Sequence, residues 1–228
     1  MDRNKRRNRG DGRLYVAQEA LENALSQLRK KGVFVEERSR GGGFVKTGLS
    51  GLDHLLGGGL LRGDISEIGG RSGALSLSLA MVAAATRRGE RVAWIDGKGA
   101  LDIRGLEAAG VLLEHFLWVR TGQEGPAERP WVILEEVLGA DVFTWAIMDL
   151  WTGRELVVPQ NKAVRVARSL KRKKTVLVLL GATSFMSALR LHCRRYQKES
   201  FEVLVSIKKY RLGMAHRSVN LSLGFPVD

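Results

Sequence analysis

Short apolar runs alternate with periodic segments along most of the chain after Phe44. The apolar runs predict strands over residues 64–68, 91–95, 115–119, 142–148 and 175–180. In the segments between them apolar residues recur every three or four positions, which predicts helices over 74–88, 101–109, 129–138 and 159–172. Because parallel strands need crossover connections, this alternation predicts a mostly parallel sheet with helices on both faces.

The pattern changes in the last part of the chain. Residues 188–195, 201–210 and 218–223 are predicted to be consecutive strands joined by turns, as in an antiparallel meander. We therefore expect an α/β fold, in which a mostly parallel sheet flanked by helices has a C-terminal antiparallel extension and an N-terminal helical arm.

The first 43 residues divide into a tail and an arm. Residues 1–13 are charged and poor in apolar side chains, which predicts a disordered basic tail. Residues 14–43 combine a helix with a glycine-rich linker, and residues 44–228 form the core. The helix carries leucines at helical spacing, namely Leu14, Leu21, Leu25 and Leu28. Two interpretations stay open: the helix docks on a partner protein, or it folds back on its own core.

Composition narrows the class of protein. The chain has 228 residues, 44% of them hydrophobic, and a mean hydropathy of −0.10, which is typical of a globular protein. The longest near-apolar stretch, residues 74–85, is too short for a membrane span, and no secretion signal follows the basic N-terminus. The single cysteine, Cys193, excludes an internal disulfide and a cysteine-rich zinc site. We expect a cytoplasmic protein.

Positive charge is concentrated in the last third of the chain. The net charge is +13, and residues 162–217 contain 15 Lys and Arg against 2 Asp and Glu. The rest of the chain is therefore balanced. Such a concentration favours a polyanionic partner, either a nucleic acid or an acidic protein surface, over a merely solvated surface.

The helix predicted over residues 159–172 presents two different sides. Ala163, Val166, Ala167 and Leu170 form an apolar side that fits the sheet. The opposite side and the C-terminal end form a cationic stripe, for which we expect a partner protein or DNA; its residues are Lys162, Arg165, Arg168, Lys171, Arg172, Lys173 and Lys174. The alternative is a well-solvated helix without a partner.

A glycine-rich loop, residues 70–73, joins the first predicted strand to the first predicted helix. This strand, loop and helix follow the plan of a phosphate-binding P-loop. Phosphate chemistry there needs a lysine for the phosphates and a Ser or Thr hydroxyl for Mg²⁺. The residues after Gly73 are Ala74 and Leu75, so both groups are absent. The loop is not a working Walker A motif.

Four segments resemble the core of a RecA-type recombinase, in the same order. They are TGLSGLDHLLGGGLLRGDISEIGGRSGALSLSLA, RVAWIDGKGALD, VFTWAIMDL and KTVLVLLGATS, and the resemblance runs over residues 47–223. It implies a RecA-like fold with a degenerate nucleotide site. Within residues 182–188 it also implies that the long DNA-gripping loop of RecA is largely lost.

The resemblance assigns a counterpart to each catalytic position. The lysine and threonine positions hold Ala74 and Leu75, and the loop from Gly70 to Gly73 is two residues shorter than in RecA. The catalytic glutamate position holds Lys98, while Asp149 keeps the Walker B position and Asp96 ends its own strand. We therefore expect no catalytic residue, cofactor or metal, and a Lys98 ion pair with Asp149 or Asp96 that closes the site. The Asn-Gln sensor pair falls at Gly181 and Ala182.

A RecA-like core without the ATPase residues, preceded by a basic arm, is similar to the ImuA group, which is also labelled SulA-like. The resemblance implies an adaptor in damage-induced translesion DNA synthesis. Its implied partners are an ImuB-type polymerase-like protein, an error-prone C-family polymerase and RecA, with DNA bound weakly or indirectly. An electrostatic DNA-binding protein that uses the basic C-terminal third is the alternative, and a residual nucleotidase is the third candidate.

Overall fold

The computed structural model describes residues 23–24, 26–27, 43–70, 72–99, 101–121, 129–149, 160–173, 175–181, 187–195, 201–213 and 215–224. The predicted tail over residues 1–13 and the four leucines of the predicted docking helix lie outside the described residues, as do Lys174 and Ala182. Within the helix predicted over residues 14–31, residues 23–24 and 26–27 are helical.

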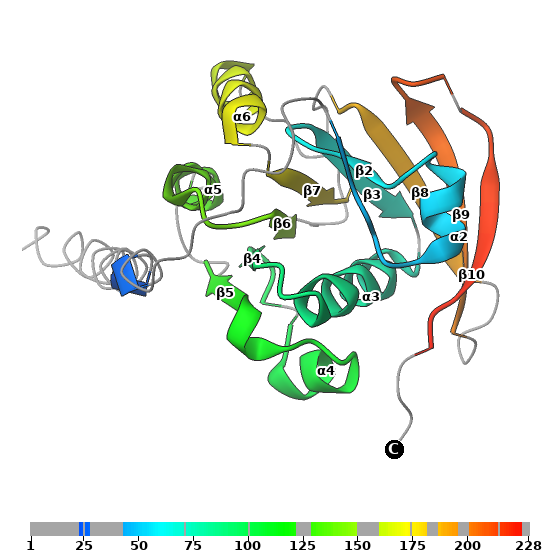
Figure 1. The fold of residues 1–228 in the computed structure, drawn as a ribbon, viewed down its shortest axis with the longest axis horizontal. Helices are drawn as coiled ribbons and strands as arrows, with labels where there is room; N and C mark the ends of the chain where they lie inside the picture. Colours follow the sequence, from blue (N-terminus) through cyan, green and yellow to red (C-terminus); the bar gives the residue numbers. More distant parts are fainter. Residues whose placement is uncertain are drawn as a thin grey trace, which may run out of the picture.

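An eight-stranded sheet forms the centre of the molecule, in the order β10-β9-β8-β3-β7-β6-β4-β5 (Figure 1). Five neighbouring pairs, from β8-β3 to β4-β5, are parallel, whereas β9 runs antiparallel to both β8 and β10. The predicted α/β class and the C-terminal meander are therefore confirmed. The strands are β3 (Ile65–Gly70), β4 (Val92–Asp96), β5 (Phe116–Arg120), β6 (Trp145–Asp149), β7 (Val176–Leu180), β8 (Leu189–Arg195), β9 (Glu202–Tyr210) and β10 (Ser218–Ser222).

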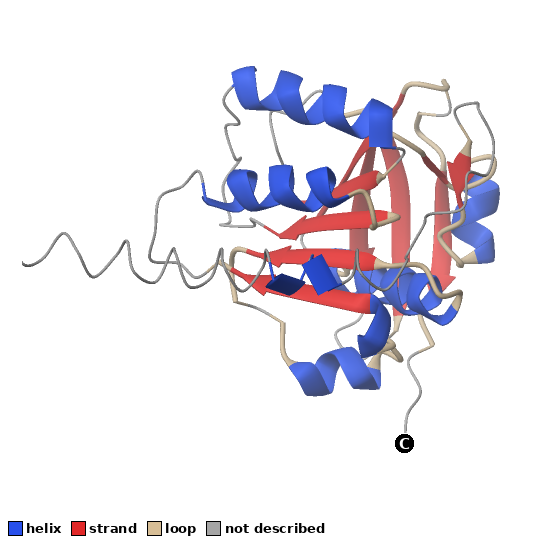
Figure 2. Cartoon of the chain, turned by 60° about the vertical axis from the view of Figure 1, so that its left-hand side comes forward, coloured by secondary structure: helices blue, strands red, loops and turns tan. Residues whose placement is uncertain are grey.

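Helices cover both faces of the sheet. On one face lie α3 (Ala74–Arg87) and α4 (Ile103–Ala108), and on the other α5 (Arg129–Ala140) and α6 (Gln160–Lys173) lie side by side (Figure 2). A short 3₁₀ helix, η1 (Leu113–His115), precedes β5. All four helices predicted within the core are present, with no end shifted by more than two residues. None of the helices in the described part of the chain combines the length and apolarity that a membrane span requires.

Alternation along each strand divides the core into two clusters. In β4, Val92 and Trp94 pack against the α3 side, and Ala93 and Ile95 pack against the α5–α6 side. Successive side chains of a strand point to opposite faces, so a strand buried on both faces must be apolar throughout. This is why the central strands appear in the sequence as unbroken apolar runs.

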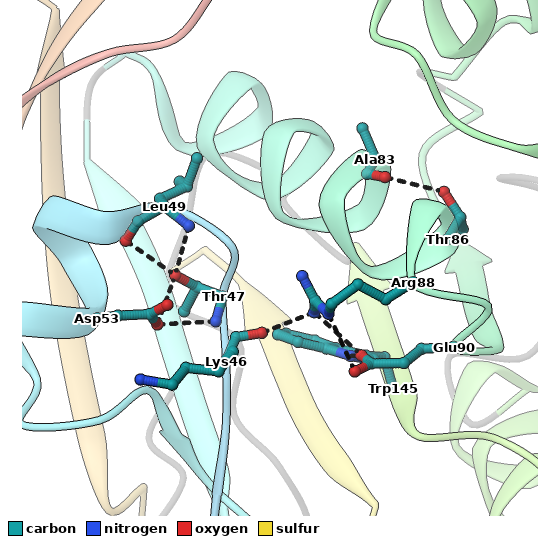
Figure 3. A network of polar contacts seen from close by, with 9 residues as sticks. All are labelled: Lys46, Thr47, Leu49, Asp53, Ala83, Thr86, Arg88, Glu90 and Trp145. Carbon is teal, nitrogen blue, oxygen red and sulfur yellow. Dashed lines mark hydrogen bonds and ion pairs between the residues drawn. The ribbon is translucent and has the colours of Figure 1, made fainter.

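Three short elements near residue 50 were not predicted. Strand β1 (Phe44–Val45) pairs antiparallel with β2 (Leu60–Leu61), and α2 (Ser50–Leu55) lies between them. The Asp53 carboxylate fixes this region, because it accepts hydrogen bonds of 2.8 Å from both the amide and the hydroxyl of Thr47 (Figure 3). Two-residue strands carry no recognisable periodicity, which is why the apolar pattern missed them.

The same segment is fastened to the rest of the molecule by Arg88. Its guanidinium donates to the Lys46 carbonyl oxygen at 2.8 Å and pairs with Glu90 at 3.2 Å (Figure 3). The Glu90 carboxylate in turn accepts from the indole nitrogen of Trp145 at 2.7 Å. These contacts join the segment before α2 to the end of α3 and the beginning of β6.

Candidate functional site

The glycine loop, residues 70–73, connects β3 to α3 as predicted. Gly70 has a φ of 131° and Gly73 a φ of 89°, both in the region that favours glycine. The Gly73 carbonyl oxygen accepts the first hydrogen bond of α3, from the Leu77 amide at 2.9 Å. Arg71 lies outside the described residues. The strand before the loop and the helix after it are therefore both arranged as in a phosphate-binding loop.

The glycine loop is packed tightly against the meander. A Cβ atom at Gly70 would lie 2.0 Å from the Cys193 carbonyl oxygen on β8. A Cβ atom at Gly73 would lie 2.9 Å from a methyl group of Val203 on β9. These glycines are required by the packing of the chain on itself, whether or not a phosphate ever binds.

Arg195, the last residue of β8, reaches the start of α3. Its backbone amide donates to the Ser72 hydroxyl at 3.0 Å, and its guanidinium donates to the Ser76 hydroxyl at 2.6 Å. The N-terminus of a helix favours an anion, yet here the chain supplies a cation next to it. This contact leaves no local pattern in the sequence, because Arg195 and Ser76 are 119 residues apart.

The first two side chains of α3 include neither a lysine ammonium nor a hydroxyl. Ala74 is half-buried and Leu75 is exposed, and no side chain caps the helix. The hydroxyl of Ser76 accepts from Arg195, and the hydroxyl of Ser78 donates to the Ala74 carbonyl oxygen at 2.9 Å. Both nearby hydroxyls are thus engaged in contacts within the protein.

Two buried carboxylates end neighbouring strands. Asp96 ends β4 and Asp149 ends β6, and the two residues are directly paired in the parallel register. The Asp96 carboxylate accepts from the Gly99 amide at 2.6 Å and from the indole nitrogen of Trp118 at 3.2 Å. It therefore holds the turn after β4 against β5, which is a structural task. Lys98 lies exposed in this turn, and its ion pair with Asp149 or Asp96 stays a prediction.

An open cavity of about 620 Å³, which was not predicted from the sequence, lies beside this turn. Its wall includes the Trp118 ring, over which the Arg120 guanidinium lies 4.5 Å from the ring centroid. Asp102, Ile103 and Arg104 at the start of α4 complete the lining. The lining therefore combines an aromatic wall with two cations and one carboxylate. The signal in the sequence was weak, because the lining comes from two separate segments.

Helix α6 has the two sides that the sequence predicts. Val166 and Leu170 are buried against the sheet, and four cations of the stripe are exposed: Arg165, Arg168, Lys171 and Arg172. Lys162 and Lys173 are half-buried. Arg165 pairs with Glu135 at 3.0 Å and Lys173 with Asp141 at 3.1 Å, so helix α5 and the residue after it neutralise two members of the stripe.

Comparison with known proteins links the chain to RecA. No protein-family model matches it. Protein RecA of Nitratidesulfovibrio vulgaris (strain DP4) is 38% identical over 111 residues, which cover 45% of this chain and 31% of that protein. Protein RecA of Ectopseudomonas oleovorans is 40% identical over 107 residues, covering 43% and 31% of the two chains. Protein RecA of Helicobacter hepaticus (strain ATCC 51449 / 3B1) is 35% identical over 141 residues, covering 58% and 40%.

The matched stretch thus spans between 31% and 40% of the length of these curated relatives. The similarity is partial, but it agrees with the mostly parallel sheet, its flanking helices and the antiparallel C-terminal strands. Over the matched stretch this chain is similar to RecA proteins, and its sheet and flanking helices form a RecA-like α/β fold.

Proposed function

We propose that this chain is a non-catalytic, RecA-related adaptor in damage-induced translesion DNA synthesis. The observation that carries the proposal is the state of the glycine loop. Its helix begins with Ala74 and Leu75, and Arg195 of the same chain reaches into its first turn. A RecA-related protein that lacks these phosphate-binding side chains, and whose own Arg195 contacts Ser72 and Ser76 beside the loop, is expected to act through its surfaces.

The chemistry of phosphoryl transfer supports this reading. Catalysis needs a lysine on the phosphates, a hydroxyl on Mg²⁺ and a base for the attacking water. In this chain the corresponding positions hold Ala74, Leu75 and Lys98. Each missing group typically costs a factor of ~10² or more in rate, so their combined loss leaves no useful hydrolysis.

Titration calorimetry with Mg-ATP, together with a phosphate-release assay, tests the non-catalytic part of the proposal. We expect no binding at micromolar ATP and no release above that of a protein-free control. A RecA protein measured in parallel shows that the assay works. Micromolar binding or steady turnover would reject the pseudo-ATPase and support the residual nucleotidase.

The proposed partners are RecA, an ImuB-type polymerase-like protein and an error-prone C-family polymerase. Relatedness to RecA supports RecA as a partner, since related chains use similar surfaces for assembly. The proposed docking surfaces are the cationic stripe of α6 and the leucines of the N-terminal arm. Purified protein added in excess should lower RecA ATPase activity and strand exchange; if both stay unchanged, damping of recombination is rejected.

Direct DNA binding by the basic C-terminal third is the second candidate. Its support is the imbalance of charge, with 15 basic and 2 acidic residues between 162 and 217. Binding through charge alone should be non-specific and weaken steeply with salt. If every partner protein that co-purifies with this chain is released by nuclease, DNA binding replaces the adaptor as the proposed function.

A further inference from the structure

Cations from three separate segments gather at the amino ends of the parallel strands, opposite the glycine loop. Arg62 lies before β3, and the end of α6 leads into β7. Because β9 is antiparallel to β8, its last residues reach the same edge. We call this set the basic edge; its residues are Arg62, Lys171, Arg172, Lys208, Lys209 and Arg211.

Backbone contacts hold these segments together. The Gly63 amide donates to the Thr175 carbonyl oxygen at 3.1 Å, and a Cβ atom at Gly63 would lie 3.2 Å from the Cα atom of Lys171. The next residue, Asp64, accepts from the Arg211 guanidinium at 2.5 Å. The end of α6, the turn before β3 and the end of β9 are therefore immediate neighbours.

A register irregularity exposes two lysines of β9 together. The strand pairing shifts between Arg190 and Leu191 of β8, where Lys209 and Ile207 are the partners. Ile207 and Tyr210 both belong to the core cluster of the α3 face. In a regular strand a single exposed residue separates two buried ones. Here two exposed residues, Lys208 and Lys209, separate the buried Ile207 from the buried Tyr210.

Helix α6 is oriented so that Lys171, near its C-terminal end, lies on the side that faces Lys208 and Lys209. Arg165 and Lys173 contact Glu135 and Asp141, which places α5 on one side of α6. Lys171 lies on the other side of the helix, given the 100° turn per residue. Because α5 packs over β6 and β4, that other side faces β3, β8 and β9.

We propose that the basic edge binds the phosphate backbone of a nucleic acid without reading its sequence. Among the described residues, the basic edge contains one ion pair, between Arg211 and Asp64, so its other five cations are available to phosphates. Half of its members are lysines, which are depleted from the cores of protein interfaces but are typical of phosphate contacts. This favours a nucleic acid over an acidic protein surface.

The basic edge extends across neighbouring strands. The Lys171 backbone lies against Gly63, in the turn before β3, and β8 separates β3 from β9. Two strand intervals of ~4.8 Å, about 10 Å in all, therefore separate the β3 end of the basic edge from Lys208 and Lys209. A phosphate backbone that crosses this end of the sheet would meet both groups of cations.

This inference rests on the second candidate, direct DNA binding by the basic C-terminal third, and assigns its site to the edge of the sheet away from the glycine loop; it shares Lys171 and Arg172 with the α6 stripe. The test is fluorescence anisotropy of the full chain with a labelled 30-base-pair DNA duplex over a range of salt concentrations. Duplex RNA and single-stranded DNA of equal length show which nucleic acid is preferred, and polyglutamate is the competitor.

The decisive variants are Lys171→Glu, Lys209→Glu and their combination. Each single change should weaken duplex binding roughly tenfold, and the double variant should reduce the log-log salt slope by about 2. Arg87→Glu is the matched control, because Arg87 is an exposed cation at the end of α3 on the opposite face. It makes the same change in net charge and should alter affinity less than twofold.

Three outcomes overturn the proposal. Duplex binding that the double variant leaves unchanged would place the contact elsewhere, and an equal loss in Arg87→Glu would reduce it to net charge. Polyglutamate that competes as well as the duplex would show an acidic-protein surface. Thermal unfolding of each variant verifies that the fold is intact before affinities are compared.

Discussion

Gly70 and Gly73 are required by the packing of the chain on itself, independently of any phosphate. Both have backbone conformations that favour glycine, and both have a neighbour from the meander where a side chain would lie. Their presence therefore needs no phosphate to explain it. Arg195 also joins the meander to this loop, because it forms hydrogen bonds with Ser72 and Ser76 at the start of α3.

Replacing Gly70 with alanine should destabilise the fold severely. The new methyl group would lie 2.0 Å from the Cys193 carbonyl oxygen, at a φ of 131°. We expect a loss of more than ~2 kcal/mol in the free energy of unfolding, measured with urea. The control is Gly139→Ala in α5, where nothing lies within 4 Å of the new atom. The control should gain up to ~1 kcal/mol, and equal losses in both variants would refute this account of Gly70.

Cys193 should be chemically silent in the native protein. Burial raises the pKa of its thiol to about 12, so the reactive thiolate is scarce near neutral pH. Native protein at pH 8 should react with a disulfide reagent far more slowly than urea-unfolded protein. The raised pKa also means that stability is lost as pH rises past the ordinary thiol range, because the unfolded thiol ionises first. Fast labelling of the native protein would contradict the packing of Cys193 beneath Gly70.

At the scale of elements, the central strands and the helices were predicted well. A strand buried on both faces is an unbroken apolar run, and a helix buried on one face has apolar residues every three or four positions. The central strands β4, β6 and β7 and helix α6 lie within a few residues of their predicted positions. Strands β1 and β2 were missed because each has two residues. The contact between Arg195 and α3 could not be predicted, because it depends on how β8 is placed beside β3.

Restoring the Walker A side chains should not restore the ATP site. The variant Ala74→Lys with Leu75→Thr supplies the missing ammonium and hydroxyl. The loop still packs tightly against β8 and β9, and Arg195 still contacts Ser76. Calorimetry with Mg-ATP should therefore detect no binding by this variant, with the unaltered chain as its control. Micromolar affinity would show that two side chains alone separate this chain from an ATP-binding protein.

At the scale of the whole molecule, the two ends of the parallel strands differ in character. One end carries the glycine loop and the buried carboxylates Asp96 and Asp149, and the other carries the basic edge. The sequence showed that the positive charge lies in the last third, but not that Arg62 joins it. That required the antiparallel return of β9 and the turn before β3, which bring distant segments to one edge.

The most direct test of the adaptor is a tagged pull-down from DNA-damaged cells, treated with nuclease, with bound proteins identified by mass spectrometry. We expect RecA or a translesion polymerase to remain bound after nuclease. Charge reversal at Arg165, Arg168 and Arg172 should weaken that capture if the α6 stripe is the interface. Loss of every such partner after nuclease would contradict the adaptor and leave direct nucleic-acid binding as the function.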